Sequence, residues 1–181
     1  TENMAHEIQT PLAIIRSKAE RLIGDENVMS EHKESVQAIY HEANHLSKLG
    51  TTLNLLTKIE NGEYTNSMNL NTQDTILKHV DSIKELVELK SLTIETNLNS
   101  EHQLVIDPFL FDIILKNLLR NSLRYSTNEG PIKIVTTTNE LKISNYGKKL
   151  QVDEQRIFER FYSSDNSNQS LGLGLALVKR I

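Results

Sequence analysis

A histidine near the start of the chain stands in a pattern that suits nucleophilic chemistry. His6 falls between the apolar positions Met4 and Ile8, and in a helix it points about 200° away from Met4. A solvent-facing imidazole on a rigid helix can attack an electrophile when its proton is accepted. Glu7 can accept that proton, and Thr10, one turn away on the same face, could position a water. His6, Glu7 and Thr10 are therefore the candidate catalytic residues.

Pro11 lies inside the same predicted helix. It cannot donate a hydrogen bond to the carbonyl of Glu7, so we expect the helix to bend beside His6. A proline in a helix interior costs about 3 kcal/mol, which favours a mobile, functional position. The other histidines have no comparable context, and we interpret them as ordinary residues: His32, His41, His45, His79 and His102.

Two asparagines four residues apart form a second candidate site. Asn117 and Asn121 project from one face of a predicted helix. An amide oxygen is a hard, neutral ligand that suits Mg²⁺, which keeps waters and phosphate oxygens as its other ligands. Asparagine is also a poor helix former. The pair therefore favours a binding role, although two asparagines could simply face solvent.

A glycine-containing run near the end of the chain could approach phosphates. Glycine lets the backbone come close to a ligand, and a helix start offers free N–H groups. Alone the run also fits a packing role. It follows an aromatic segment, residues 157–162, and a polar stretch, residues 163–171, that we expect to be mobile until a ligand orders it. The run comprises Gly172, Leu173, Gly174 and Leu175.

Residues 1–60 predict two long helices that would carry His6. Their apolar residues recur at steps of three and four, which is typical of helices with one buried face. Residues 24–27 supply the break, and Ser30 is the expected N-cap of the second helix. The stripes are Met4, Ile8, Leu12, Ile15, Ala19 and Leu22, then Val36, Ile39, Ala43, Leu46, Leu49, Leu53, Leu56 and Ile59.

A lone hairpin of two helices buries little apolar surface. We therefore expect two copies of the chain to form a dimeric four-helix bundle. The alternative is that the hairpin packs on the rest of its own chain.

The remaining sequence predicts an α+β layered domain with helices covering one face of a sheet. Residues 61–67 are polar and aperiodic, as in a linker. We expect helices over 73–89 and from Pro108 to about Tyr125, strands over 92–96 and 103–106, and a hairpin of 132–138 with 141–144. The predicted domains are residues 1–62 and 68–181.

Composition excludes several classes of protein. The chain has 181 residues, of which 38% are apolar and 24% charged, so a folded protein is expected. A net charge of −4 disfavours a nucleic-acid partner. The absence of cysteine excludes disulfides and thiolate chemistry. No apolar run could span a bilayer. Both ends fall inside amphipathic patterns, so we expect an upstream membrane sensor outside this sequence.

The motifs and their order resemble those of sensor histidine kinases. Residues 5–12 are similar to the H-box pattern H-E-x-x-T-P-L, residues 113–126 to the N-box, residues 157–162 to the F-box and residues 172–178 to the second glycine box. The resemblance spans nearly the whole chain. It implies a HisKA dimerisation and phosphoacceptor hairpin, followed by a HATPase_c domain with the Bergerat-type α/β sandwich of gyrase, heat-shock chaperone and mismatch-repair ATPases.

The resemblance also implies an activity. ATP would phosphorylate His6 of a homodimer, and the phosphoryl group would pass to an aspartate on the receiver domain of a response regulator, with the chain on the cytoplasmic side. Asn121 would be the principal Mg²⁺ ligand, and Asn117 would support the phosphates. The other implied nucleotide-binding residues are Arg124, Tyr125, Asn145, Gly147, Arg160, Phe161 and the glycine run 172–175.

Three positions depart from the family pattern. The first glycine box, D-x-G-x-G, has Asn145 in place of the aspartate that accepts from the adenine amino group, and Lys149 in place of the second glycine. Ser170 replaces the first glycine of the later box. A neutral amide accepts a weaker hydrogen bond than a carboxylate. We therefore interpret the nucleotide site of this chain as a variant of the family's site that resembles kinases of Bacteroidetes-type bacteria. We expect the variant to bind ATP with lower affinity. The sequence also stops before the last elements that the family has.

Two rival functions are compatible with the same residues. A chain that binds nucleotide weakly would be a dimeric scaffold, or a phosphatase that uses Thr10 on a response regulator. A chaperone-like ATPase of the same superfamily would hydrolyse ATP without labelling itself.

Overall fold

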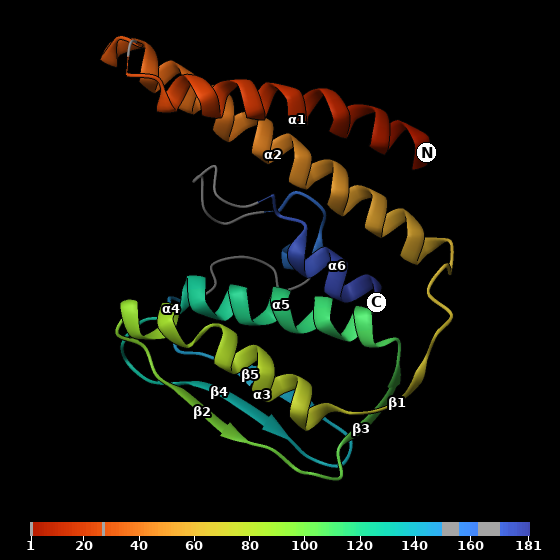
Figure 1. Ribbon diagram of the computed structural model, residues 1–181. Helices are drawn as coiled ribbons and strands as arrows, with labels where there is room; N and C mark the ends of the chain where they lie inside the picture. The colour runs from red at the N-terminus through yellow and green to blue at the C-terminus, as the bar shows by residue number, and fades with distance from the viewer. Residues whose placement is uncertain (1, 27, 150–155, 163–170) are drawn as a thin grey trace. The chain divides into compact units, whose positions relative to one another are not determined.

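The fold is that of a computed structural model (Figure 1), in which residues 2–26, 28–149, 156–162 and 171–181 are described, with the backbone alone at residues 2–7, 30 and 31. The chain divides into two compact units, Thr1–Asn61 and Gly62–Ile181. The first is helical and the second holds all the strands of the described residues.

The helical unit is an antiparallel hairpin of α1 (Glu2–Gly24) and α2 (Ser30–Glu60), as predicted. α1 continues through Pro11. The side-chain amide of Gln9 donates to Thr51 Oγ1 over 3.0 Å, which fixes the register of the two helices. Their contact buries small and branched residues: Leu12, Ala19, Ala43 and Leu56. The cap prediction is wrong by one residue, because Met29 is the N-cap and Ser30 begins the helix.

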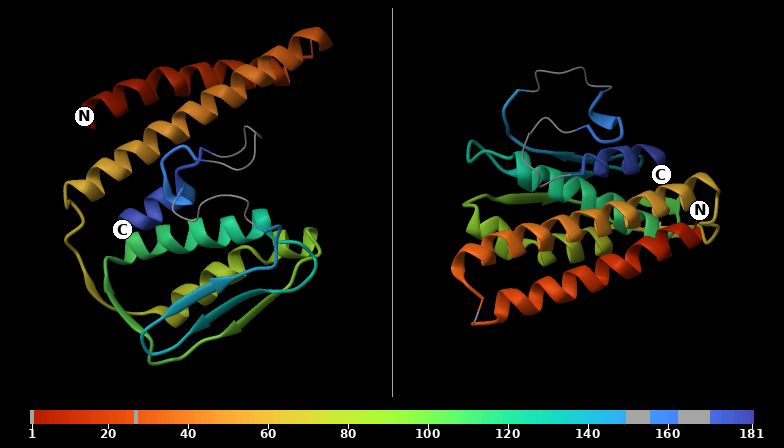
Figure 2. Two further views of the ribbon diagram at one scale, coloured as in Figure 1. Left: turned by 180° about the vertical axis from the view of Figure 1, so that it is seen from behind. Right: turned by 90° about the horizontal axis from the view of Figure 1, so that it is seen from above.

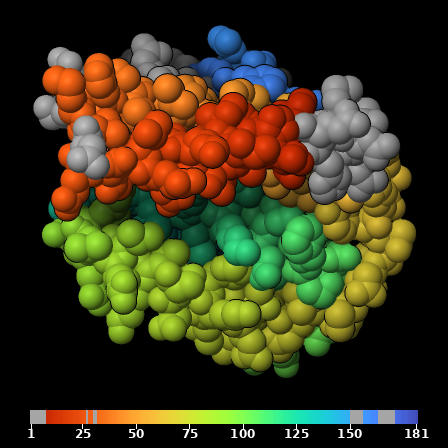
Figure 3. Space-filling view, turned by 45° about the horizontal axis from the view of Figure 1, so that its top comes forward, coloured from red at the N-terminus to blue at the C-terminus, as the bar shows by residue number. Residues whose placement is uncertain are grey.

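The apolar stripes of the hairpin are only partly buried within one chain. Ile8, Ile15 and Leu22 on α1 are 44–49% exposed. On α2, Ile39 and Leu46 are 52% and 49% exposed. Residues seven apart lie on one helix face, so each helix carries a second apolar row beside the row that its partner helix covers. Figure 3 shows the side chains of residues 8–24 of α1, in red and orange, as a continuous row.

The second unit contains two small sheets. β1 (Met68–Asn71) pairs antiparallel with β3 (Gln103–Ile106). β2 (Ile94–Asn97) runs parallel to β4 (Ile132–Thr136), which pairs antiparallel with β5 (Leu141–Ser144). The predicted hairpin is confirmed, with Thr136 opposite Leu141. The prediction of one sheet is wrong for the described residues. The sequence did not predict β1. Apolar residues and asparagines alternate in this run of four residues, and it forms a strand only by pairing with the distant β3.

Helices cover one face of the three-stranded sheet, as expected (Figure 2). They are α3 (Thr72–Ser82), α4 (Lys84–Leu89) and α5 (Pro108–Tyr125). The short α6 (Gly174–Arg180) packs on the side of α5 that faces away from the sheet (Figure 1). The single helix predicted over 73–89 is in fact two, because Ile83 leaves the helical conformation at φ −110° and ψ 3°. Ile76 of α3 and Val87 of α4 are both buried, so the core-facing row of the sequence continues across the break.

The core of this unit lies between α3, α5 and the sheet. Ile76 of α3 and Phe111, Leu115 and Leu119 of α5 pack together with Ile134 of β4, all at most 2% exposed. A neighbouring cluster joins the end of α5 to α4 through Leu123 and Val87. Among the described residues no helix combines the length and the apolar character needed to cross a bilayer.

We expect Leu115→Ala to destabilise the second unit by about 2–5 kcal/mol, because it leaves a cavity in a fully packed site. Leu89 is the matched control, since it is 80% exposed at the end of α4, and Leu89→Ala should change the free energy of unfolding by less than about 0.5 kcal/mol. Urea unfolding followed by circular dichroism measures both. Equal effects of the two substitutions would contradict this core.

Candidate functional site

The candidate catalytic residues of the helical unit lie near the start of α1. His6, Glu7 and Thr10 are all within the helix, and the side chains of His6 and Glu7 lie outside the described part of the structure. Thr10 is exposed. It lines a shallow hollow of about 500 Å³ together with Ala13, Ile14, Ser17 and Lys18. The Gln9–Thr51 bond places the His6 level of α1 beside the last two turns of α2.

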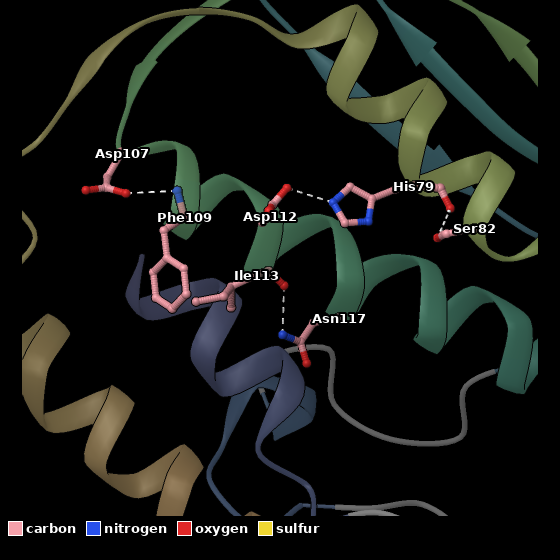
Figure 4. Close-up of polar contacts among 7 residues, drawn as sticks. All are labelled: His79, Ser82, Asp107, Phe109, Asp112, Ile113 and Asn117. Atoms are coloured by element: carbon pink, nitrogen blue, oxygen red, sulfur yellow. Dashed lines mark hydrogen bonds and ion pairs between the residues drawn. The ribbon is translucent and has the colours of Figure 1, made fainter.

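α5, which carries the asparagine pair, is fixed at both ends. At its start Asp107 accepts a hydrogen bond from the backbone N–H of Phe109 over 2.9 Å, and Pro108 occupies the first position (Figure 4). At its end the Lys90 ammonium donates to the carbonyl of Leu123 over 2.9 Å. Both contacts satisfy groups that a helix leaves without intrahelical partners.

A third contact ties α5 to α3. His79 Nε2 lies 2.8 Å from Asp112 Oδ1 (Figure 4), and the His79 side chain is 10% exposed. His102 is fully buried, with its Nδ1 2.7 Å from the Thr72 hydroxyl. Both histidines are packed into the fold of the second unit, in keeping with their interpretation as ordinary residues.

The two asparagines differ in the hydrogen bonds that their side-chain amides make. Asn117 Nδ2 donates to the carbonyl of Ile113 over 2.8 Å (Figure 4). Its Oδ1 faces the start of α6, where a Cβ on Gly174 would lie only 2.8 Å away. Asn121 is half-buried, and within the described ranges none of the hydrogen bonds engages its side chain. The oxygen of Asn121 is thus available to a ligand.

The turn after β5 packs against the end of α5. A Cβ on Gly147 would lie 2.4 Å from the carbonyl oxygen of Tyr125, so only glycine fits there. The backbone N–H of Thr127 donates to the carbonyl of Tyr146 over 2.8 Å. The amide of Asn145 reaches the same oxygen at 3.4 Å, and Asn145 itself is exposed. This packing brings the turn next to the helix that carries Asn121.

Two further residues hold this turn, and neither was predicted from the sequence. Thr127 supplies the N–H just described. Gly130 makes room for the Tyr146 ring, since a Cβ there would come within 2.5 Å of ring carbons. Neither residue carries a signal in the sequence, because its partner is well over a dozen positions away along the chain.

The aromatic segment and the glycine run also meet through their backbones. A Cβ on Gly172 would lie 2.5 Å from the carbonyl carbon of Phe161, and Gly172 adopts φ +64°. Phe161 itself adopts φ +65°, a strained conformation for a bulky residue. Leu173 is 1% exposed, so only its backbone can meet a ligand. The predicted lid, residues 163–171, lies almost entirely outside the described residues, as does Ser170.

The remaining predicted residues lie around these contacts. The Arg124 guanidinium is 5.5 Å from the centroid of the Tyr125 ring, and Tyr125 is 37% exposed. Arg160 and Lys149 are exposed, and Leu175 is half-buried. The structure thus places the turn at 145–147 against the end of α5, and the start of α6 against the middle of the same helix at Asn117. The part of the chain that is described contains no cluster of three acidic or histidine side chains able to hold a metal.

The donor set around Asn121 fits Mg²⁺ held mainly by a substrate. Mg²⁺ keeps several waters and commonly takes only one or two protein oxygens beside phosphate oxygens. A half-buried amide oxygen that accepts no hydrogen bond from the described residues suits that arrangement. A metal site built from protein carboxylates alone would need a cluster of acidic side chains, and the described residues contain no such cluster.

Gly147→Ala should destabilise the second unit by about 1–3 kcal/mol, because the new methyl group must displace the Tyr125 backbone. Gly50 is the matched control. It lies inside α2, where an added Cβ would have nothing within 4 Å, and Gly50→Ala should stabilise the helix by about 0.5–1 kcal/mol. Thermal unfolding and amide hydrogen exchange measure the two effects. An unchanged exchange rate at Thr127 in Gly147→Ala would contradict the packing described.

Comparisons with known proteins match both units. Residues 1–62 match the family described as His Kinase A (phospho-acceptor) domain. Residues 106–181 match the histidine kinase-, DNA gyrase B- and HSP90-like ATPases. The Heme sensor protein HssS of Staphylococcus saprophyticus is 31% identical over 99% of this chain and 40% of its own length. Sensor histidine kinase HprS of Escherichia coli is 26% identical over 99% and 41%.

Solved structures show the same fold. The chain resembles full-length ShkA, crystallised in complex with AMPPNP, with a TM-score of 0.74 and 20% identity over 98% of this chain and 39% of that one. It resembles the Acinetobacter baumannii histidine kinase AdeS with a TM-score of 0.64 and 23% identity over 97% and 84%. The chain spans 40% of the length of HssS and 41% of that of HprS. With its HisKA helices followed by a HATPase_c unit, the chain belongs to the sensor histidine kinases.

Proposed function

We propose that the chain is the catalytic core of a histidine kinase, which transfers the γ-phosphoryl group of ATP to His6 and then to an aspartate of a response regulator. One observation carries the proposal. The turn at Asn145 lies against the end of α5, the glycine-lined start of α6 lies against Asn117, and Asn121 lies between these two levels, in the same chain as the histidine of a HisKA helix.

The proposed nucleotide site uses backbone and amide groups. Asn121 would provide the protein oxygen for Mg²⁺, whose charge neutralises the phosphates when it is bound. Asn117 would support the phosphates beside Gly174, and the backbone N–H groups of residues 172–175 would face them. Arg124 belongs to the last turn of α5, and the Phe161 backbone contacts Gly172. Together with Arg160 these residues would meet the phosphates, and Tyr125 and Asn145 would meet the base.

The proposed transfer exchanges one bond to phosphorus for another. A nitrogen of the His6 imidazole forms a bond to the γ-phosphorus, while the bond from that phosphorus to the β–γ bridging oxygen breaks and ADP leaves. Glu7 accepts the imidazole proton. Such transfers depend mainly on alignment and charge neutralisation. The receiver aspartate then takes the phosphoryl group from His6, and Thr10 positions water for the opposing hydrolytic reaction.

The proposed active form is a homodimer. Ile8, Ile15, Ile39 and Leu46 are 44–52% exposed in the single chain. A second hairpin would cover these rows in a four-helix bundle, in which apolar residues seven apart pack between helices. The reaction places the chain in the cytoplasm, because ATP and response regulators are found there.

The first test follows the labelled phosphate. Incubation with γ-labelled ATP and Mg²⁺ should give acid-labile, base-stable label in the wild-type chain. His6→Gln should lose the label and keep ATP binding, whereas Asn121→Ala should lose both. His41 is the matched control, as another exposed histidine on the hairpin, and His41→Gln should label normally. Label that persists in His6→Gln would contradict the assignment of His6 as the phosphorylated residue. Hydrolysis of ATP without any label on the chain would favour the chaperone-like ATPase.

A second test concerns the base. Asn145→Asp should tighten Mg·ATP binding about five-fold, because a charge-assisted hydrogen bond contributes about 1 kcal/mol more than a neutral one. Calorimetric titration measures the dissociation constant. The acidic change Asn66→Asp, in the exposed segment before β1, controls for net charge and should leave binding unchanged. Weaker binding in Asn145→Asp would place the base elsewhere.

A further inference from the structure

The side-chain amide of Asn145 has an orientation that the sequence does not reveal. Its Nδ2 donates to the backbone carbonyl of Tyr146 over 3.4 Å. An amide carries its donors on nitrogen and its acceptor on oxygen, so this bond turns Oδ1 away from the Tyr146 carbonyl. Asn145 is exposed. In the observed orientation the side chain therefore offers a ligand an acceptor.

The carbonyl that sets this orientation belongs to a fixed backbone. The N–H of Thr127 donates to the same Tyr146 oxygen over 2.8 Å. Gly147 leaves room beside the amide, since a Cβ there would lie 3.3 Å from Asn145 Nδ2. The Tyr146 oxygen thus stays in place, and the orientation of the Asn145 amide is what can change.

Little holds the amide in the orientation that the structure shows. A distance of 3.4 Å is long for a hydrogen bond between N–H and O, and water can reach the exposed Asn145 side chain. Half a turn of the amide about its last side-chain bond exchanges Nδ2 and Oδ1 and breaks the bond to Tyr146. Losing one such weak bond changes an equilibrium constant about two- to five-fold.

The two orientations match two kinds of purine. The 6-position of adenine carries an amino group, which donates, whereas that of hypoxanthine or guanine carries an oxygen, which accepts. Asn145 accepts from the amino group as it stands, and after half a turn its Nδ2 donates to the oxygen. An ionised aspartate has acceptors alone, so it would leave a 6-oxo group unpaired and repel it. Sites with such a mismatch reject the wrong ligand strongly.

We propose that Asn145 relaxes the base selectivity of the nucleotide site, which takes 6-oxo as well as 6-amino purine nucleoside triphosphates. This inference rests on the proposed kinase function, in which Asn145 meets the base. Asn145 is the residue that determines specificity, and the Tyr146 carbonyl positions its amide. The preference that remains for adenine equals the cost of breaking the Asn145–Tyr146 bond.

The first measurement compares ATP with inosine triphosphate, whose base has the 6-oxo group. By calorimetric titration with Mg²⁺, the wild type should bind inosine triphosphate only about two- to five-fold more weakly than ATP. In Asn145→Asp the same ratio should rise to about a hundred-fold or more. In Asn145→Ala both nucleotides should bind more weakly and equally. Asn139→Asp, at an exposed asparagine in the β4–β5 turn, is the matched control and should keep the wild-type ratio.

A third nucleotide controls for damage to the fold. Purine riboside triphosphate carries only hydrogen at the 6-position, so it gives Asn145 no partner there. It should bind the wild type, Asn145→Asp and Asn145→Ala alike, whereas a misfolded variant would lose it. With γ-labelled inosine triphosphate at saturating concentration, the wild type should also label His6.

The outcomes separate this inference from the function on which it rests. A wild-type ratio above about ten, well beyond the loss of one weak hydrogen bond, overturns the relaxed selectivity alone. A ratio that does not rise in Asn145→Asp also overturns it, because the charge of the side chain would then not decide which base is bound. A wild-type chain that binds none of the three nucleotides overturns the proposed function, and the relaxed selectivity with it.

Discussion

The burial of one face of α5 determines the geometry of the second unit. Leu115 and Leu119 are held in the core against β4, together with Ile134. Asn117 and Asn121 each follow one of these leucines by two positions, which turns them about 200° away from the core. The asparagine pair therefore faces outward because the leucine pair faces inward. The Asp107 cap, the Lys90 contact and the His79–Asp112 pair then prevent the helix from sliding or turning.

The elements around the asparagine pair are assembled through close backbone contacts. Gly147 lets the turn after β5 touch the Tyr125 carbonyl, Gly172 lets the glycine run touch the Phe161 backbone, and Gly174 admits the Asn117 amide. A side chain at any of these positions would push two elements apart. Glycine thus has a packing role here that is compatible with the phosphate-binding role we propose, since both need a backbone that can be approached closely.

The helical unit poses a different physical problem. Small residues, Ala19 and Ala43, let α1 and α2 pack closely, but a hairpin of two helices has too little interior to cover all of its apolar rows. Ile15 and Leu46 remain nearly half exposed. Surface of this kind is what a second hairpin would bury in the proposed dimer.

The sequence alone determined the elements whose signals are local. Apolar residues at steps of three and four predicted α1 and α2, Pro108 predicted the start of α5, and the pattern of residues 132–138 and 141–144 predicted the hairpin of β4 with β5, because such signals are properties of neighbouring residues. Only the tertiary structure decided the rest. β1 needs a partner more than thirty residues away, Ile83 breaks a helix whose apolar period continues, and Thr127 and Gly130 acquire their contacts from distant segments. Such contacts carry no pattern along the chain, because they depend on which surfaces folding brings together.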